Sequence, residues 1–273
     1  MNSFIIRTIS AFVFVALMLS ALYYSHISFI LLFSIIAYLT YVEFIKHISI
    51  NTHRQLIYLS YFSSSIILTV SAMYFLGFVQ LKHLLIGIPF VSAQYLYSVF
   101  LKDRNSFAEL SKISFAQVYV LIPFIFFMHI AFTNDIALYE PHLVASFFIL
   151  LWMNDAGAYL SGITFGKHKL IERISPNKTI EGFIGGMLMT LISSVLIALY
   201  FLPEISINHW LVLAVIIVLF GTVGDLFESL LKRTLGIKDS GNIMPGHGGF
   251  LDRFDALIGA APAYFIYLYF FVG

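Results

Sequence analysis

The sequence predicts an all-α, polytopic transmembrane helical bundle. Of its 273 residues, 60% are hydrophobic and only 11% are charged, whereas a soluble domain usually carries about 25% charged residues. The hydrophobic residues come in runs of about 20, the length that a helix needs to cross a hydrocarbon layer. Closed β-barrels need alternating strands of about ten residues, and these runs are continuously apolar. The fold is therefore expected to be a bundle of membrane-spanning helices.

About nine spans are expected where hydrophobic runs lie between charges, Pro and turn residues. They are expected at 8–24, 27–45, 56–79, 83–101, 115–132, 143–163, 183–202, 209–231 and 256–272. The first run follows Arg7 as in a signal peptide, but it is long for one and no small-residue cleavage site follows, so we expect a retained helix. Little chain remains for a soluble domain, and function is expected from the bundle and its loops.

Positive charge predicts the orientation of the bundle. With nine spans, fourteen of the fifteen Lys and Arg residues fall on one side, and only Lys82 falls on the other. The positive-inside rule then places the N-terminus in the cytoplasm and the C-terminus outside. A bacterial inner (cytoplasmic) membrane is the expected location, with the active site on its cytoplasmic side.

Charge also divides the chain into two parts. Segments 155–182 and 225–255 hold more than half of all charged residues. We therefore expect a transmembrane scaffold at 1–142 and a catalytic part at 143–273, with cytoplasmic loops at 164–182 and 232–255. The sequence contains no cysteine, so any metal must be held by oxygen or imidazole ligands. No nucleic-acid partner is expected.

Two aspartates lie within or at the end of hydrophobic runs, where an ionised side chain costs about 2.5–3.5 kcal/mol. Asp155 lies midway along the sixth run, among small residues that allow close helix packing; a polar contact between helices explains it as well as a functional role does. Asp225 ends the apolar part of the eighth run, and helical spacing puts Ser229 and Lys232 on the same stripe. An ion pair between Glu228 and Lys232 on a solvated helix end is the ordinary interpretation of those two residues.

The segment KDSGNIMPGHGGFLDRFD, residues 238–255, is the most informative in the chain. Its glycines allow backbone amides to converge on an anion. Asp252 and Asp255 follow just before the ninth span, and carboxylates beside a Gly-rich loop suit Mg²⁺. An ordinary turn before an aspartate-capped helix is the alternative. The second charged loop contains ISPNKTIEGFIGG, residues 174–186, in which Thr179 to Gly182 are expected to open the seventh span.

Both segments resemble a known family. The stretch SLLKRTLGIKDSGNIMPGHGGFLDRFD, residues 229–255, is similar to the signature of phosphatidate cytidylyltransferase, also called CDP-diacylglycerol synthase. DAGAYLSGITFGKHKLIERISPNKTIEGFIGG, residues 155–186, resembles the family's second conserved block. It departs from that block at Ala156, where Thr is common, and at Asn177, where a basic residue is common.

The resemblance implies transfer of a cytidylyl group from CTP to phosphatidic acid, giving CDP-diacylglycerol and pyrophosphate in phospholipid biosynthesis. It also implies Mg²⁺, a second cation such as K⁺, and a homodimer in the membrane lipid. We expect Asp225, Asp252, Lys232 and Lys178 to be catalytic, and Asp225, Asp252 and Asp255 to hold the metal. The residues expected to bind substrate are Ser175, Thr179, Ser229, Arg233, Lys238, His247, Gly248, Gly249, Arg253 and Asp155.

The expected chemistry needs no general base, because the attacking phosphate is already ionised at neutral pH. Positioning and charge stabilisation therefore carry the reaction. His247 is expected to contact either pyrophosphate or ribose. A CTP-dependent transferase or kinase acting on another lipid, such as a polyprenol, is the nearest alternative. An aspartyl protease using Asp155 and Asp225 lacks the usual Gly-x-Gly-Asp context, and an ion-coupled transporter predicts charges near the bilayer midplane.

Overall fold

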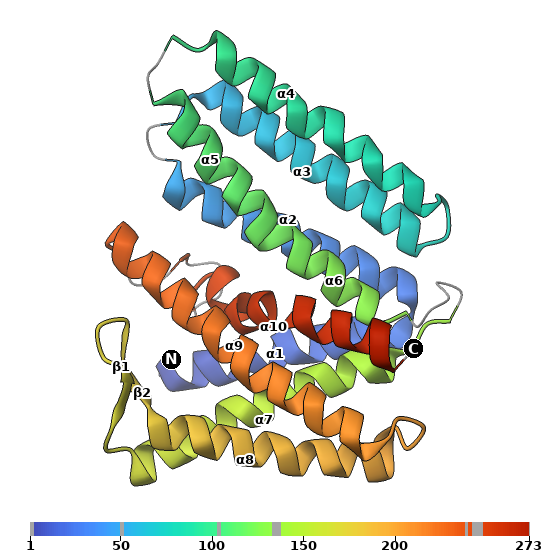
Figure 1. Ribbon diagram of the computed structural model, residues 1–273, viewed down its shortest axis with the longest axis vertical. Helices are drawn as coiled ribbons and strands as arrows, with labels where there is room; N and C mark the ends of the chain where they lie inside the picture. Colours follow the sequence, from blue (N-terminus) through green and yellow to red (C-terminus); the bar gives the residue numbers. More distant parts are fainter. Residues whose placement is uncertain are drawn as a thin grey trace. The chain divides into compact units, whose positions relative to one another are not determined.

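The computed structural model describes residues 3–49, 52–102, 105–132, 138–237, 240–241 and 248–272, with side chains from residue 9 onward (Figure 1). Within these ranges, eight helices are long and apolar enough to cross a membrane, and Ile9–Tyr24 is a shorter apolar stretch. Many large hydrophobic side chains on them are exposed, among them Phe12, Val99 and Leu188. The prediction of an all-α polytopic bundle is confirmed, and the chain is an integral membrane protein. The orientation of its ends remains a prediction.

The chain forms two compact units. Unit 1 comprises residues 1–128 and 239–253, and unit 2 comprises residues 129–238 and 254–273. Unit 1 therefore includes residues 239–253, which lie in the sequence between the two parts of unit 2. These two units are defined by packing, whereas the division between 1–142 and 143–273 was predicted for function. The functional division therefore stays a prediction.

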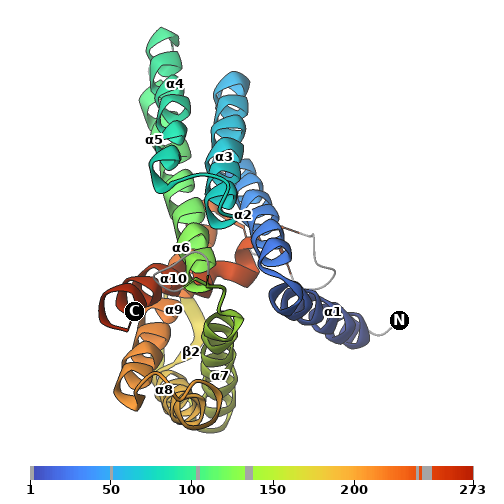
Figure 2. The same ribbon diagram turned by 90° about the vertical axis from the view of Figure 1, so that its right-hand side faces the viewer.

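Unit 1 is built mainly of helices. They are α1 (Ser3–Tyr24), α2 (His26–Ile48), α3 (Arg54–Phe75), the 3₁₀ segment η1 (Leu81–Ile86), α4 (Gly87–Phe100), α5 (Ser106–Ala116), the π-helical segment η2 (Gln117–Leu121) and α6 (Ile122–Ile130). Ser25 caps α2 by accepting the amide hydrogens of Ile27 and Ser28. Phe29, Phe33 and Phe127 form an aromatic core with ring centroids 4.8–6.0 Å apart. Figure 2 shows α3 and α4 side by side.

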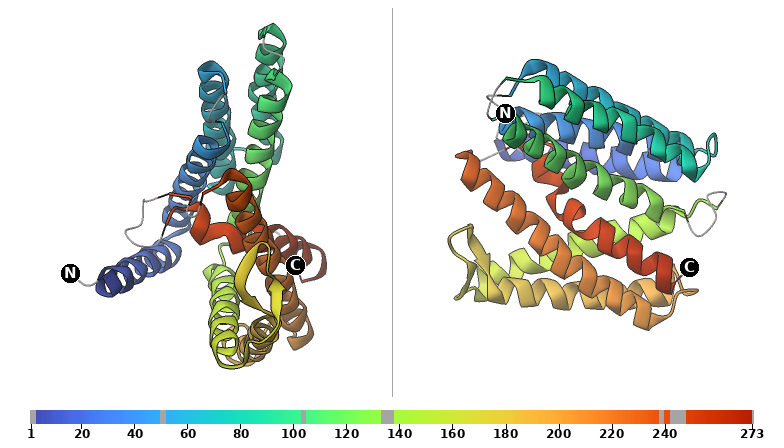
Figure 3. Two further views of the ribbon diagram at one scale, coloured as in Figure 1. Left: turned by 90° about the vertical axis from the view of Figure 1, so that its left-hand side faces the viewer. Right: turned by 45° about the horizontal axis from the view of Figure 1, so that its top comes forward.

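Unit 2 is a second helical group that carries a small hairpin. Its elements are α7 (Pro141–Phe165), β1 (Lys169–Ile171), β2 (Ser175–Thr179), α8 (Ile180–Leu196), the π-helical segment η3 (Ile197–Phe201), α9 (Ile207–Leu235) and most of α10 (Leu251–Phe271). Helix α8 packs on α7 and α9. The buried rings of Phe147 and Tyr264 meet edge to face. Figure 3 shows the hairpin leaving the end of the α7–α8 pair.

The helices begin and end near the predicted spans, with informative exceptions. The helix of the fifth span begins at Ser106 rather than at 115, because its first turns consist partly of polar residues, such as the buried Glu109, that precede the apolar run. The ninth begins at Leu251 rather than at 256, which places Asp252 and Asp255 inside the helix instead of before it. The antiparallel hairpin, in which Lys169 pairs with Thr179, replaces the loop expected before the seventh span.

Candidate active site

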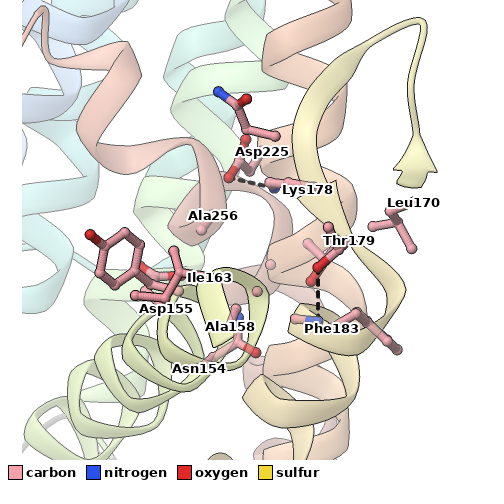
Figure 4. A pocket seen from close by; sticks show the side chains of 16 residues that line it. Asn154, Asp155, Ala158, Ile163, Leu170, Lys178, Thr179, Phe183, Asp225 and Ala256 are labelled. Atoms are coloured by element: carbon pink, nitrogen blue, oxygen red, sulfur yellow. Dashed lines mark hydrogen bonds and ion pairs between the residues drawn. The ribbon is translucent and has the colours of Figure 1, made fainter. Parts of the chain in front are cut away.

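Unit 2 contains an open cavity of about 540 Å³ beside the hairpin. Figure 4 shows the side chains that surround it. Helix α7 contributes Asn154 and Asp155, strand β2 contributes Lys178, and α9 contributes Asp225. Ala256 of α10 completes the lining. The structure thus brings Asp155, Lys178 and Asp225, predicted from segments far apart in the sequence, to one cavity.

Lys178 and Asp225 form the central contact of this cavity. Lys178 Nζ lies 2.6 Å from Asp225 Oδ2, and the two side chains are 28% and 36% exposed. The Ser229 hydroxyl lies 3.5 Å from Asp225 Oδ1, at the limit of a hydrogen bond. The cation and the carboxylate are therefore held together in an open cavity, where both side chains remain partly exposed.

The rest of the predicted stripe on α9 behaves differently. Lys232 Nζ lies 2.7 Å from Glu228 Oε2 in an i, i+4 ion pair. The expected ion pair is present, but Glu228 is buried rather than on a solvated helix end. Arg233 is exposed in the last turn of α9, which Gly236 ends in the left-handed conformation at φ 69°.

Two further carboxylates belong to the same electrostatic environment. Asp255 interacts with the charges of Asp225, Lys178 and Asp155. Asp155 in turn interacts with Asp225 and Lys178. Three acids accordingly interact with the charge of one lysine, an excess of negative charge that favours a bound cation.

Glycines bring α9 and α10 close enough to place two of these acids together. A Cβ atom on Gly224 would lie 2.9 Å from Cα of Gly259, and it would also collide with the backbone oxygen of Asp255. Because Gly224 precedes Asp225 and contacts the backbone of Asp255, this crossing sets the separation of the two carboxylates.

A similar crossing of α7 and α8 places Asp155. A Cβ atom on Gly157 would lie 2.8 Å from the backbone oxygen of Gly185, and one on Gly186 would lie 2.6 Å from Oδ1 of Asn154. Small residues on both helices thus permit backbone contact, as expected from the sequence. Asp155 extends from this crossing into the cavity (Figure 4).

The hairpin that carries Lys178 is fixed at its base. The Thr179 hydroxyl accepts the amide hydrogen of Gly182 at 3.1 Å and caps α8, the predicted start of the seventh span. The Glu181 carboxylate accepts the amide hydrogens of Lys167 and His168 and contacts His168 Nδ1 at 2.6 Å. Thr179 also lines the cavity, so capping explains its polar group without a substrate. Ser175, also predicted to bind substrate, lies in β2 opposite Ile171.

A second polar cluster lies in unit 1, at both ends of segment 242–247. Asp252 Oδ2 accepts the amide hydrogens of Ser240 at 2.9 Å and of Gly249 at 2.8 Å. Gly248 has φ 82°, a conformation that favours glycine. These contacts assign Asp252 at least one role, which is to hold the backbone around the glycines. Arg253 follows on the exposed side of α10.

Glu43 completes this cluster and is the functional candidate that sequence reasoning missed. It lies in α2, is 5% exposed, and accepts hydrogen bonds from Ser240, Phe250 and Leu251. Its only signal in the sequence is a lone acid inside a hydrophobic run. Lys238 and His247, two predicted substrate ligands, lie outside the described residues.

The donor set suits a hard divalent cation that shares its ligands with a substrate. Within the described ranges, no group of three His, Cys, Asp or Glu residues is close enough to hold a metal by itself. Mg²⁺ is usually bound by one or two carboxylates together with water and substrate phosphates. Asp225 and Asp255, which interact electrostatically, are of the residue type that this requires, and both remain predicted ligands together with Asp252.

Comparison with known proteins identifies the family of this chain. A protein named phosphatidate cytidylyltransferase from Staphylococcus haemolyticus is 45% identical over 186 residues, 67% of each chain. Proteins of the same name from Staphylococcus aureus and Staphylococcus epidermidis are 44% and 42% identical over the same length and shares. The model of the cytidylyltransferase family matches residues 5–271, nearly the whole chain. An integral membrane protein with an acid-rich cavity around one lysine, this chain therefore belongs to the cytidylyltransferase family.

Proposed function

We propose that this protein transfers the cytidylyl group of CTP to phosphatidic acid, giving CDP-diacylglycerol and pyrophosphate. The family match across residues 5–271 carries this conclusion, and the named relatives indicate the lipid substrate. The Lys178–Asp225 contact in an open cavity supports it, since a cation and acids at one accessible surface suit a phosphate-rich substrate. With CDP-diacylglycerol as its product, the enzyme acts in phospholipid biosynthesis.

The reaction is a substitution at phosphorus. A phosphate oxygen of phosphatidic acid attacks the α-phosphorus of CTP, a new P–O bond forms, and the bond to the bridging oxygen of the β-phosphate breaks. Pyrophosphate leaves with that oxygen and its electrons. The nucleophile is already an anion, so catalysis consists of bringing two anions together and stabilising charge on the leaving group.

Lys178 is the residue best placed to bind a phosphate in the cavity. Its side chain is 28% exposed, and it precedes Thr179, which fixes the base of the hairpin. Before substrate binds, the contact with Asp225 keeps Lys178 oriented. When substrate binds, Lys178 can exchange this contact for one with a phosphate oxygen. Lys232, Lys238, Arg233 and Arg253 are proposed to neutralise the remaining phosphate charge. The amides around Gly248 and Gly249 are proposed to donate hydrogen bonds to one phosphate group. The Gly249 amide, which donates to Asp252 Oδ2 in this structure, would exchange that contact for a phosphate oxygen.

Mg²⁺ is proposed to be held by Asp225, with Asp255 and Asp252 as further ligands. When bound, it would supply positive charge to the nucleotide phosphates. Asp155 interacts with the charges of Lys178 and Asp225, and it is proposed to orient the lysine. A second cation such as K⁺, a homodimer, and a cytoplasmic active site in a bacterial inner membrane belong to the same proposal.

The experiment that tests this function uses the purified full-length protein with CTP, Mg²⁺ and phosphatidic acid. CTP labelled at the α-phosphate should transfer its label to a lipid, with release of one pyrophosphate per lipid product. Omission of Mg²⁺, or addition of excess EDTA, should abolish transfer. CTP labelled at the γ-phosphate should leave the lipid unlabelled.

The same assay decides between the alternatives. A lipid kinase would transfer the γ-label, and a polyprenol offered in place of phosphatidic acid would then be the better acceptor. An ion-coupled transporter would form no labelled lipid with either nucleotide. Either result would refute cytidylyl transfer to phosphatidic acid.

A further inference from the structure

Glu43 is a buried acid of α2 whose contacts all lie in a segment far along the chain. Its Oε2 accepts the amide hydrogen of Phe250 at 2.9 Å, and its Oε1 accepts that of Leu251 at 3.0 Å. The Ser240 hydroxyl donates to Oε1 at 2.5 Å. Each of these partners is a donor, so the carboxylate accepts on both oxygens. Two successive backbone amides and a hydroxyl are thus fixed by one side chain.

Ser240 shows how completely this part of the backbone is held. Its hydroxyl donates to Glu43 and its amide donates to Asp252 Oδ2. Its carbonyl oxygen contacts Nε2 of His47, one turn beyond Glu43 on α2. All three polar groups of a residue that is 1% exposed are therefore satisfied, two of them by α2.

Glycines allow the backbone to approach the Glu43 carboxylate. A Cβ atom on Gly241 would lie 2.6 Å from Glu43 Oε2, and one on Gly249 would collide with both carboxylate oxygens. Gly241 precedes residues 242–247 in the sequence and Gly249 follows them. Glu43 accordingly contacts the chain on both sides of that segment.

We propose that Glu43 is a positioning residue for nucleotide binding: from α2 it holds residues 240–241 and 248–251. The backbone at Gly248 and Gly249, with the Gly249–Asp252 hydrogen bond, is thereby kept in the arrangement that meets the phosphates of CTP. This inference rests on the proposed function. It adds a residue from the first half of the chain to the machinery of the second. Glu43 itself contacts the backbone and Ser240, and acts through them.

Glu43→Gln is the decisive variant. Glutamine has the same shape but a single acceptor oxygen, so its NH₂ group must face the amide of either Phe250 or Leu251. One donor is then left facing another donor. We expect kcat/KM for CTP to fall by about tenfold or more, mainly through KM for CTP, while KM for phosphatidic acid changes little. Amide exchange in a peptide covering residues 248–252 should accelerate, with the rest of the protein unchanged.

Glu109→Gln is the matched control. Glu109 is also a 5% exposed acid of unit 1. It accepts the amide hydrogen of His53 at 3.3 Å, which the glutamine oxygen can accept instead. Its CTP kinetics should match those of the wild type. Equal losses in both variants would reduce Glu43 to a general structural role and overturn the inference.

Ser240→Ala tests the same contact from the other side. It removes the hydroxyl that donates to Glu43 and also lies 3.0 Å from Asp252 Oδ2, and it leaves α2 intact. The KM for CTP should therefore rise, by a smaller factor than in Glu43→Gln. If Glu43→Gln does not yield folded protein, unchanged CTP kinetics in Ser240→Ala refute the inference. If the wild type turns over CTP and Glu43→Gln has the same CTP kinetics, the inference about Glu43 is refuted while the proposed function stands. A wild type that does not use CTP refutes the proposed function.

Discussion

Asp225 is the acid that pairs with the cavity lysine, 2.6 Å from Lys178 Nζ. Asp225→Asn keeps the shape of the side chain but removes its charge, and with it both the ion pair and the strongest proposed metal ligand. We expect turnover to fall by about a hundredfold or more in an assay of labelled CDP-diacylglycerol at saturating Mg²⁺. Melting in detergent should stay close to that of the wild type.

Glu172→Gln is the control for that substitution. Glu172 is exposed in the turn between β1 and β2, so it tests the loss of one negative charge near the hairpin without touching the cavity. Its activity should equal that of the wild type. Full activity of Asp225→Asn at saturating Mg²⁺ would remove Asp225 from the metal site.

The individual residues of the site were predictable to different degrees. Asp225 and Lys178 stand out in the sequence because each charge occurs beside an apolar run. Their pairing was not predictable, since it depends on a hairpin that brings β2 to α9. Glu43 was missed because a lone acid in a hydrophobic run reads as a packing contact until its partners, about 200 residues away, are known.

At the scale of helices, the Gly224–Gly259 crossing controls the carboxylate pair. A Cβ atom on Gly224 would lie 2.9 Å from Gly259 Cα, so Gly224→Ala must force α9 and α10 apart. We expect a loss of stability of about 1–3 kcal/mol, measured by thermal unfolding in detergent. A fall in turnover should accompany it, because Asp225 and Asp255 separate.

Gly221→Ala is the stability control for that crossing. It lies one turn earlier on α9, and its added Cβ would meet Leu151 Cδ1 at 3.5 Å, an ordinary van der Waals distance. Its melting temperature should match that of the wild type. If Gly224→Ala were as stable as Gly221→Ala, the crossing of α9 and α10 would accommodate a methyl group at position 224, which would contradict this prediction.

The start of α8 provides a test of the hairpin base. Thr179→Val removes the hydroxyl that accepts the Gly182 amide hydrogen, and loss of such a cap costs about 1 kcal/mol. We expect Thr179→Val to lower both the melting temperature in detergent and the turnover. Thr179→Ser keeps the hydroxyl, so both should be close to those of the wild type. If Thr179→Ser instead stayed as impaired as Thr179→Val, the methyl group rather than the cap would be responsible.

The hairpin itself shows the limit of sequence reasoning about elements. Its strands are Lys169–Ile171 and Ser175–Thr179, too short and too polar to show an alternating pattern, and an isolated pair of strands is marginal in water. Contacts of Glu181 with Lys167 and His168 stabilise it here. The long apolar helices were predictable because each must satisfy its backbone hydrogen bonds within the membrane.

At the scale of the whole molecule, the orientation of the bundle is the main prediction. Since the chain has no cysteine, single cysteines can be introduced without background. Glu172→Cys should react with a membrane-impermeant maleimide only after cells are permeabilised, because loop 164–182 is predicted to be cytoplasmic. Glu204→Cys, in the turn before α9, should react in intact cells. The reverse pattern would invert the orientation and with it the proposed side of the active site.

The contact between Glu43 and Ser240 joins residues 197 positions apart, which has a consequence for biosynthesis. At about 5–20 residues per second, a ribosome needs roughly 10–40 s to make the chain between them. Throughout that interval α2 holds an acid whose eventual donors have not yet been translated. Unit 1 therefore reaches its final packing only after all of unit 2 up to α10 has left the ribosome, and an insertase or chaperone that shelters α2 during this delay would raise the yield of assembled enzyme.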